Sequence, residues 1–307
     1  PEGSRWTEAL HRINKRIKKA TNDSVQLKVY AGGIQGDEPV VLRKMRIGQL
    51  QGGGFAGPSM SQILPDILAL QLPFLFSDYN EVDFVLENTK ENFSKRYRQR
   101  GYVNLGWADI GFVHLLSQVP ISTLEDIQSH PVWRLEGEPI TEILFRLGNV
   151  YSTPLTIPDV LLGLQTDLVS VVYASPVAAI VLQWFTRVSY INEFPINFAL
   201  GAFLLSERAY NSIPQTYRQI LRAISEEEMR TLSLEMRREN VEALAVLQSN
   251  GVQINKVSAL DINTFEELVK ETIEELLKDP MPPDTHSQVQ TLLEQFREEK
   301  RAKLNAN

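Results

Sequence analysis

The residues that commonly carry out catalysis are few and scattered in this chain. Its four histidines lie far apart, and none belongs to an HExxH or similar metal-binding pair; they are His11, His114, His130 and His286. The chain has no cysteine, which excludes thiolate metal sites, cysteine nucleophiles and disulfides. It also has no GxSxG motif to hold a nucleophilic serine. The sequence therefore predicts no metal, no cofactor and no catalytic centre.

Two glycine-rich segments and one acidic pair remain as candidates for ligand chemistry. The loop AGGIQGDE at 31–38 lacks the lysine and hydroxyl of a phosphate-binding loop, and GGG at 52–54 lacks the GxGxxG spacing of a dinucleotide site. These glycines are expected to serve turns and close approach of the backbone to a neighbour or ligand. Asp37 and Glu38 stand at the start of a predicted helix, where carboxylates interact favourably with the helix dipole. The two glycine-rich segments are therefore expected to serve turns, and the acidic pair to cap a helix, rather than to bind a ligand.

Composition indicates a folded protein with a sizeable core. Of 307 residues, 43% are hydrophobic and 22% are charged, which argues against extended disorder. A formal net charge of −7 speaks against a nucleic-acid-binding surface, which normally shows a basic excess on one face. The Lys and Arg residues gathered between positions 12 and 19 are interpreted as the solvated side of an amphipathic helix.

Neither a membrane span nor a leader is evident. The apolar run Ile63–Leu75 is interrupted by prolines, an aspartate and a glutamine, so no segment is expected to cross a membrane. No signal peptide is recognised, but a chain that begins at Pro1 rather than at methionine is expected to be processed or trimmed, which leaves export open.

Helix and strand patterns alternate through the first third of the chain. Apolar residues recur at helical spacing over 6–17, and 25–30 alternates apolar with polar residues as a half-buried strand does. A helix over Glu38–Ile47 and a short strand within 49–57 follow. Together these segments predict a βαβ unit with parallel strands and a right-handed connection. A helix over 83–101 and a strand over 102–109 continue the alternation.

A second group of elements suggests a second lobe. Strands over 132–137 and 168–175 flank a helix over Ile140–Leu147, around a separate sheet. The segment Pro214–Asn250 carries a helical apolar stripe and would measure about 55 Å at 1.5 Å per residue, which is longer than one small lobe is wide. Such a helix has to run across both lobes. Helices over Thr264–Leu277 and Gln288–Lys303 complete the chain, and a two-lobed α/β protein of this kind suggests a cleft for a small ligand.

Trp133 and Arg134 pose a question of orientation. They are neighbours in a predicted strand, where alternation sends successive side chains to opposite faces, so only one of them can face a cleft. A tryptophan there would offer apolar contact, and an arginine would offer charge. The alternatives are a tryptophan that only fills the core and an arginine that only pairs with Glu136 or Glu138 at the surface.

Four sequence blocks stand in order along the chain: VYAGGIQGDEPVVLRKMRIGQLQGGG, LPDILALQLPFLFSDYNEVDFVL, LGWADIGFVHLLSQVPISTLEDIQS and LTIPDVLLGLQTDLVSVVYASP. They resemble blocks of the solute-binding subunits of TRAP transporters (tripartite ATP-independent periplasmic transporters) of the DctP type. The resemblance extends from about Pro1 to the middle of the long helix. VWRLEGEP and VVYASP are similar to a subgroup in which some members pair with a tetratricopeptide-repeat lipoprotein, and for which a hydrophobic ligand is expected.

The resemblance implies an α/β, two-lobed periplasmic-binding-protein-like fold (type II, TRAP type) with a long helix spanning both lobes. Lobe I would comprise 1–112 and 200–240, and lobe II 113–199 and 241–307, with helix 214–250 crossing both. The protein would close around a solute in the inter-lobe cleft and deliver it to the membrane permease subunits. Its location would be periplasmic, either free or lipid-anchored through an N-terminal segment that is removed or absent here.

The sequence departs from the family pattern where the family binds a carboxylate. Typical members carry an arginine after the aromatic-Gly-Phe step, a second arginine at the end of the following strand, and polar residues in the last block. This chain has Val113, Trp133 and Tyr173 at those places, with Arg134 one step beyond. Tryptophan cannot supply the charge-assisted bidentate hydrogen bonds of an arginine clamp, so the resemblance implies that the clamp is lost.

These departures predict a receptor for a hydrophobic or amphipathic solute, such as a fatty acid or related organic acid. Buried apolar contact contributes about 25 cal/mol per Å², and the indole N–H and phenol O–H would be free to orient one polar group. The predicted ligand-binding residues are Trp133, Tyr173, Val113, Phe112, Arg134, Ser175, Trp6 and Phe55.

Three alternatives remain open. A one-residue shift of the alignment would give Arg134 the clamp's role and make the protein a conventional carboxylate receptor. An enzyme on a two-lobed scaffold would need a nucleophile, metal set or cofactor loop that the sequence lacks. A partner-binding module could use the acidic region from Asp261 onward, although charged helices are usually solvated faces.

Overall fold

The computed structural model describes residues 3–257 and 259–305. The chain divides into two units, each built from three separate segments. Unit 1 comprises Pro1–Leu64, Thr89–Ile110 and Leu200–Arg238, and unit 2 comprises Pro65–Asn88, Gly111–Ala199 and Glu239–Asn307. The lobe boundaries expected from the sequence stay a prediction, and their end residues 1–2 and 306–307 lie outside the described part of the chain.

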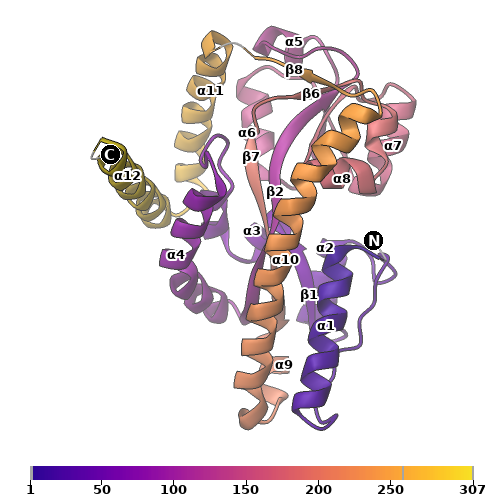
Figure 1. The fold of residues 1–307 in the computed structure, drawn as a ribbon, viewed down its shortest axis with the longest axis vertical. Coiled ribbons are helices and arrows are strands. Elements are labelled where there is room, and N and C mark those ends of the chain that lie inside the picture. The colour runs from indigo at the N-terminus through magenta and orange to yellow at the C-terminus, as the bar shows by residue number, and fades with distance from the viewer. Residues whose placement is uncertain (1–2, 258, 306–307) are drawn as a thin grey trace. The chain divides into compact units, whose positions relative to one another are not determined.

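Four elements contain residues of both units. They are helix α4 (Tyr79–Gln99), strand β2 (Tyr102–Ser117), strand β7 (Asn197–Ser206) and helix α10 (Gln215–Ser249). Helix α10 runs unbroken for 35 residues, as the apolar stripe predicted, and is drawn in orange in Figure 1. Its residues up to Arg238 belong to unit 1 and those from Glu239 to unit 2.

Unit 1 opens with an amphipathic helix that packs through a narrow stripe. Helix α1 (Arg5–Ala20) begins at Ser4, whose hydroxyl accepts a hydrogen bond from the Thr7 amide. The predicted apolar stripe is buried at Ala9, Ile13 and Ile17. On its other side, the guanidinium groups of Arg12 and Arg16 bond the Glu228 carboxylate of α10 at 2.7 and 2.8 Å. These two arginines, interpreted from the sequence as solvated, therefore join the two helices.

The remaining elements of unit 1 form a small sheet with helices beside it. They are α2 (Glu38–Arg46), β1 (Gly52–Ala56), α3 (Gly57–Ile63) and α9 (Glu207–Ser212), together with the unit 1 portions of β2, β7, α4 and α10. Asp37 caps α2 by accepting from the Val40 amide, as the capping interpretation predicted. Strand β1 pairs antiparallel with β7, with Phe55 opposite Ala202.

The predicted βαβ unit is wrong. Residues 25–30 are not a strand, and the Leu27 amide donates to the Asn14 side-chain oxygen of α1 at 2.8 Å rather than to a neighbouring strand. Strand β1 pairs antiparallel with a strand about 150 positions later in the chain. Alternation reports that one side of an extended segment is buried, but it does not report which segment supplies the backbone hydrogen bonds.

Unit 2 contains a mixed sheet in the order β4-β3-β5-β2-β6-β8. Strands β3 (Val132–Leu135), β4 (Ser152–Leu155) and β5 (Val171–Ala174) run parallel. Strand β2 is antiparallel to β5 on one side and to β6 (Tyr190–Asn192) on the other, and β6 is parallel to β8 (Gln253–Asn255). Strand β4 has no counterpart in the sequence-based expectation, because STPL is short and contains a proline.

Further helices complete unit 2. They are η1 (Pro65–Leu70), α5 (Leu124–Gln128), α6 (Pro139–Leu147), α7 (Ile157–Gln165), α8 (Pro176–Val181), η2 (Trp184–Thr186), α11 (Ala259–Lys278) and α12 (Pro283–Asn305). Helix α11 packs along α6 (Figure 1), and α12 packs on η1. The two C-terminal helices occur where the sequence placed them, each a few residues longer than predicted.

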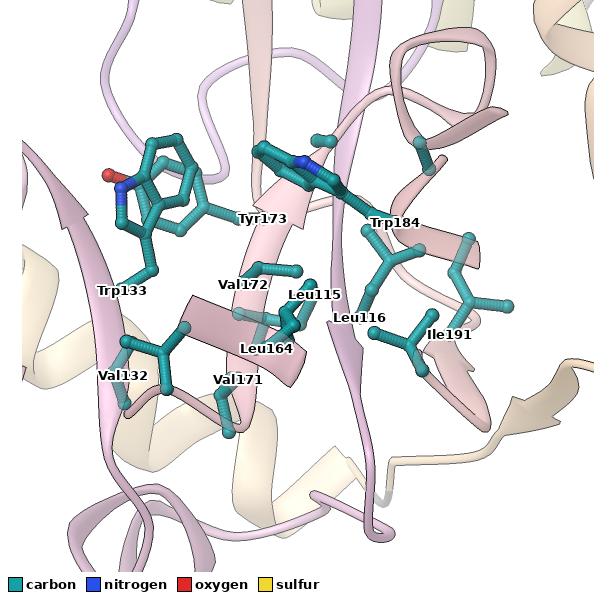
Figure 2. Close-up of a cluster of buried hydrophobic side chains, with 14 of the residues drawn as sticks. Leu115, Leu116, Val132, Trp133, Leu164, Val171, Val172, Tyr173, Trp184 and Ile191 are labelled. Carbon is teal, nitrogen blue, oxygen red and sulfur yellow. The ribbon is translucent and has the colours of Figure 1, made fainter. Parts of the chain in front are cut away.

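The core of unit 2 gathers the apolar residues of the central strands. Val132, Val171, Val172 and Leu116 are fully buried, and Leu247 of α10 joins the same cluster. Figure 2 shows Leu116, Val132, Val171 and Val172 in a layer beside the central strands. Three large aromatic rings lie at one end of the layer, and they are the starting point for the site.

Candidate functional site

Three aromatic rings of unit 2 pack against one another. Trp133 on β3 stacks on Tyr173 of β5, with ring centroids 4.6 Å apart and planes tilted by 28°. Trp184 of η2 meets Trp133 edge-on at 5.2 Å. Figure 2 shows Trp133 and Tyr173 face to face with Trp184 beside them. Strands β3 and β5 pair in parallel, and this pairing brings together two residues that were predicted for the site.

The polar atoms of this pair are already bonded within the protein. The Trp133 indole N–H donates to the Leu155 carbonyl at 3.0 Å. The Tyr173 hydroxyl donates to Glu138 Oε2 at 3.0 Å and accepts from the Leu135 amide at 3.0 Å. The expectation that both groups would be free to orient a ligand is therefore wrong, because neighbouring carbonyl, carboxyl and amide groups use them first. What the pair can offer a ligand is apolar surface.

A buried glutamate, Glu138, accepts the hydrogen bond of the Tyr173 hydroxyl. Glu138 precedes α6, and its Oε2 also accepts from the Thr141 hydroxyl at 2.7 Å. Burial raises the pKa of Glu138, and the Thr141 and Tyr173 hydroxyls and the Arg134 charge only partly offset that rise. Burial, followed by the charge of Glu138, likewise raises the pKa of Tyr173 well above its ordinary value.

Arg134 lies on the same strand with a different partner. Its guanidinium forms an ion pair with Glu142 of α6 at 3.5 Å, and its side chain is 19% exposed. The sequence-based alternative named Glu136 or Glu138 as the partner of Arg134, but the ion pair is formed with Glu142 instead. Such a pair, with one exposed partner, contributes little to stability.

An apolar pocket of about 100 Å³ lies within unit 2. Its walls come from helices α5, α6 and α11, from strands β2, β5, β6 and β7, and from four connecting segments, at 73–74, at 150, at 194–196 and at 257. The lining residues are Pro73, Phe74, Leu115, Leu124, Ile127, Ile140, Thr141, Leu144, Phe145, Val150, Tyr173, Asn192, Phe194, Ile196, Asn197, Val257, Phe265, Leu268 and Val269. Of the residues predicted for the site, Tyr173 is the one that lines this pocket.

The other predicted site residues of unit 2 have structural partners. Val113 belongs to the same core cluster as Trp133, and its carbonyl accepts from the Ile196 amide at 2.7 Å. The Phe112 ring packs edge-on against Tyr79 at 4.9 Å. Ser175 caps α8 by accepting from the Ala178 amide.

Trp6 and Phe55 belong to unit 1. The Trp6 ring lies over strands β1 and β7, so close that a Cβ built on Gly201 would stand 2.6 Å from it and one on Gly54 would stand 3.1 Å from it. Gly201 is therefore required for this close approach, and a side chain at Gly54 would press on the ring. Phe55 is buried in the core with 1% of its surface exposed.

The described residues offer little for other chemistry. Within 3–257 and 259–305, no three His, Asp or Glu side chains gather in a way that could hold a metal ion. Over the same ranges, no helix combines the length and apolar character needed to cross a membrane. His114 is buried with its Nδ1 at 2.8 Å from the Asn192 carbonyl oxygen, and burial lowers its pKa despite that bond.

A family model described as bacterial extracellular solute-binding protein, family 7 (DctP), matches residues 1–279. The chain belongs to this family. Among curated relatives, the family 7 chain is 24% identical over 164 residues to a solute-binding protein of Chromohalobacter salexigens, covering 53% of this chain and 48% of that protein. It is 20% identical over 214 residues to one of Verminephrobacter eiseniae, covering 69% and 63%. The chain thus spans about half the length of the first of these relatives.

Solved structures of TRAP periplasmic solute-binding proteins share the fold of this family 7 chain. One from Sulfitobacter sp. with bound β-D-galacturonate is 18% identical with a TM-score of 0.86, covering 95% of this chain and 96% of that one. One from C. salexigens with bound D-glucuronate is 18% identical with a TM-score of 0.87, covering 96% and 97%. A Bordetella pertussis extracytoplasmic solute receptor binding pyroglutamic acid is 17% identical with a TM-score of 0.87, covering 96% of each. The predicted fold class is confirmed.

Sequence reasoning missed the polar and apolar surroundings of the aromatic pair. Glu138 stands directly before Pro139, the first residue of α6. Because proline at that position is a helix start signal, the sequence could have marked Glu138 as the N-cap residue. The pocket could not have been found in this way, because Phe74, Asn197 and Val269 are far apart in the sequence and no local pattern joins them.

The buried carboxyl group makes a prediction about pH. The pKa of Glu138 is higher in the folded protein than the ordinary value of 4.5. Above that value the unfolded chain has lost the proton that the folded protein still holds, so the free energy of unfolding falls as pH rises through the window up to the folded pKa. Glu138→Gln cannot ionise and keeps an oxygen acceptor, so its stability relative to wild type should increase with pH across that window. Urea denaturation at several pH values between 4 and 8 measures this.

Glu142→Gln is the matched control for that experiment, because Glu142 lies one turn further along α6 and its side chain is 60% exposed. Its stability should follow the wild-type pH dependence. If the free energy of unfolding has the same pH dependence in wild type and in Glu138→Gln, burial does not raise the pKa of Glu138 and the prediction is wrong.

Proposed function

We propose that this family 7 protein is the solute receptor of a TRAP transporter and binds a hydrophobic or amphipathic small molecule, such as a fatty acid or related organic acid. The observation that carries the proposal is the stacked pair of Trp133 and Tyr173 at positions where the resemblance places polar anchors. The neighbouring pocket, whose lining is overwhelmingly apolar, supports the same ligand class. Trp133, Tyr173 and Val113 are proposed as apolar contacts, and binding occurs without turnover.

The proposed partners follow from the same family. The receptor would lie in the periplasm, free or lipid-anchored, and deliver its solute to membrane permease subunits. The likeness of VWRLEGEP and VVYASP to the tetratricopeptide-associated subgroup supports a tetratricopeptide-repeat lipoprotein as accessory partner. A co-purifying helical-repeat protein with an oligomer-scale mass would support that partner, and a receptor that stays monomeric in its presence would argue against it.

A second candidate function is a conventional acid receptor. Solved proteins of the same fold bind galacturonate, glucuronate and pyroglutamic acid. Arg134 follows Trp133 in β3, and releasing it from Glu142 would give an acid a charged partner. Its existing ion pair and the bonded state of the Trp133 and Tyr173 polar atoms make this the less favoured candidate.

Mass spectrometry of the small molecules extracted from the purified protein tests the proposal directly. The expected result is an aliphatic or amphipathic compound that is released on denaturation in an amount comparable to the protein. Recovery of a sugar acid or a small dicarboxylate would overturn the hydrophobic-ligand proposal and support the second candidate.

Arg134→Ala separates the two candidates by its effect on affinity for the extracted ligand. For a hydrophobic ligand, we expect the dissociation constant to change less than threefold, because the guanidinium is paired with Glu142 and makes no essential contact. Loss of a charged clamp would instead weaken binding at least tenfold, equal to about 1.4 kcal/mol or more. Arg146→Ala is the matched control, because Arg146 is an exposed arginine of α6 that pairs with Glu275. Isothermal titration calorimetry measures all three proteins.

A further inference from the structure

Helices α6 and α11 and two of the connecting segments supply much of the lining of the unit 2 pocket. Ile140 and Leu144 line it from α6, and Leu268 and Val269 line it from the adjacent helix α11. Phe74 and Ile196 come from two loops that are fastened together, since the Phe74 amide donates to the Ile196 carbonyl at 2.9 Å. The lining is therefore held by packed helices and by backbone hydrogen bonds. The pocket is partly open rather than sealed.

Most polar groups on the lining have partners within the protein. Thr141 donates to Glu138, and the Tyr173 hydroxyl bonds Glu138 and Leu135. The Asn192 side-chain oxygen accepts from the Asn255 amide group at 3.3 Å. None of these groups needs a ligand to satisfy it.

Asn197 is different. It is the first residue of β7 and lines the pocket, and its Oδ1 is buried yet accepts no hydrogen bond from the described residues. A buried acceptor without a partner is unfavourable, so a rotation of the Asn197 amide that presents this oxygen to the pocket would favour a molecule that brings a hydrogen-bond donor over one that does not.

Charge and size restrict that molecule further. Among the described residues that line the pocket there is no Lys, Arg or His, so an ionised carboxylate placed inside would have no counter-charge. A cavity of about 150 Å³ with an apolar lining holds benzene. The volume of about 100 Å³ here corresponds, on that scale, to a chain of about four carbon atoms.

We infer that this pocket binds a short unbranched aliphatic segment whose end group is neutral and donates a hydrogen bond to Asn197 Oδ1, as an alcohol, an amide or an un-ionised acid does. The inference rests on the proposed function and sharpens it: the receptor selects an aliphatic ligand by a donating, uncharged group rather than by a carboxylate. Longer ligands would extend through the open side of the pocket.

A series of straight-chain alcohols from ethanol to 1-hexanol tests the pocket on the intact protein. We follow the methyl NMR signals of Ile140, Leu144 and Val269 during titration. Each added methylene should tighten the dissociation constant about fourfold until the pocket is full near 1-butanol, and the gain should then level off. Shifts spread evenly over the protein, or affinity that rises without a plateau, would contradict the inference.

The end group is tested by comparing 1-butanol with 1-fluorobutane, which has a similar shape but no donor. We expect 1-butanol to bind about fivefold more tightly to the wild type. In Asn197→Leu this preference should disappear while 1-fluorobutane still binds. A preference that survives in Asn197→Leu would overturn the role of Asn197.

A filling variant provides the spatial control. Val269→Phe places a larger side chain in the pocket and should weaken 1-butanol binding at least tenfold, whereas Val181→Phe, at an exposed position of α8, should not change it. If Val269→Phe does not fold, the chain-length series and Asn197→Leu still decide the question.

The outcomes separate this inference from the proposed function. If an aliphatic ligand extracted from the protein binds Val269→Phe and Asn197→Leu as it binds wild type, the pocket inference fails and the proposed function stands. If the extracted ligand is a sugar acid while 1-butanol binds in the pocket as described, the proposed function fails and the pocket remains a separate site.

Discussion

Replacing Trp133 by alanine is expected to lower the free energy of unfolding by about 3–5 kcal/mol, the range found for large aromatic side chains removed from a core. Trp133 is 3% exposed, stacks on Tyr173 and meets Trp184 edge-on. Alanine would leave a cavity between two rings, because the strands that carry them are held by sheet pairing and cannot close it. Urea denaturation followed by far-ultraviolet circular dichroism measures the loss without depending on the fluorescence of the removed residue.

Two further variants test the cause of this loss, one at Trp133 itself and one at an exposed aromatic residue as a control. Trp133→Phe keeps an aromatic ring but removes the N–H that bonds the Leu155 carbonyl, so we expect a loss of about 1–3 kcal/mol. Tyr151→Ala removes an aromatic ring that is 69% exposed, and its effect should stay within about 0.5 kcal/mol. A loss below about 1 kcal/mol in Trp133→Ala would mean that the ring contributes little to the stability of the core.

The helices were largely predictable from the sequence, because their apolar residues recur at helical spacing and their ends carry recognisable signals. The stripe at Ile13 and Ile17 is buried in α1, and Asp37 caps α2. The long helix α10 follows the predicted range to within one residue at each end. These features depend on residues a few positions apart, and a sequence displays such relationships directly.

The strand partners were not predictable in the same way. The alternating segment at 25–30 lies extended without joining a sheet, since an asparagine of α1 takes the Leu27 amide. Strand β1 pairs with β7, and β2 continues eight residues beyond the predicted strand, to Ser117. Pairing joins segments separated by about 150 residues, and alternation carries no information about which of them meet.

The candidate site was partly predictable. The family register placed Trp133 and Tyr173 in one site, and the structure stacks them. Glu138 was considered only as a surface partner of Arg134, although it is buried and holds the Tyr173 hydroxyl. Asn197 Oδ1 accepts no hydrogen bond from the described residues. Whether such an oxygen has a partner depends on every group around it, and only the three-dimensional structure shows which of those groups are already paired.

Replacing Arg297 by methionine is expected to lower the free energy of unfolding by about 2–3 kcal/mol at neutral pH. Arg297 of α12 forms a two-pronged ion pair with Glu81 at 2.8 Å and also donates to the Leu75 carbonyl. The Glu81 side chain is only 4% exposed, so the variant would leave a buried carboxylate without its counter-charge. The value lies below the 3–5 kcal/mol found for fully buried pairs because the Arg297 side chain is 37% exposed.

The pH dependence of this loss identifies its cause. Burial alone would raise the pKa of Glu81, but the hydrogen bonds and charge of Arg297, together with the Ser77 amide, outweigh burial and lower it. A lowered folded pKa contributes stability that is present above the ordinary value of 4.5 and is lost as pH falls through the folded pKa. The difference between wild type and Arg297→Met should therefore be largest near neutral pH and shrink in acid. Denaturation curves between pH 3 and 7 measure it.

The neighbouring pair on the same helix supplies the control. Lys300 bonds Asp78 with side chains that are 51% and 34% exposed, so Lys300→Met should cost no more than about 0.5 kcal/mol. Adding Glu81→Gln to Arg297→Met removes the buried carboxylate that has lost its counter-charge, and it should recover part of the free energy of unfolding. Hydrogen exchange along α12 should accelerate in Arg297→Met and stay unchanged in Lys300→Met, because Arg297 and not Lys300 ties the helix to a buried group. Equal acceleration in both variants would instead indicate that apolar packing and general charge hold α12 in place.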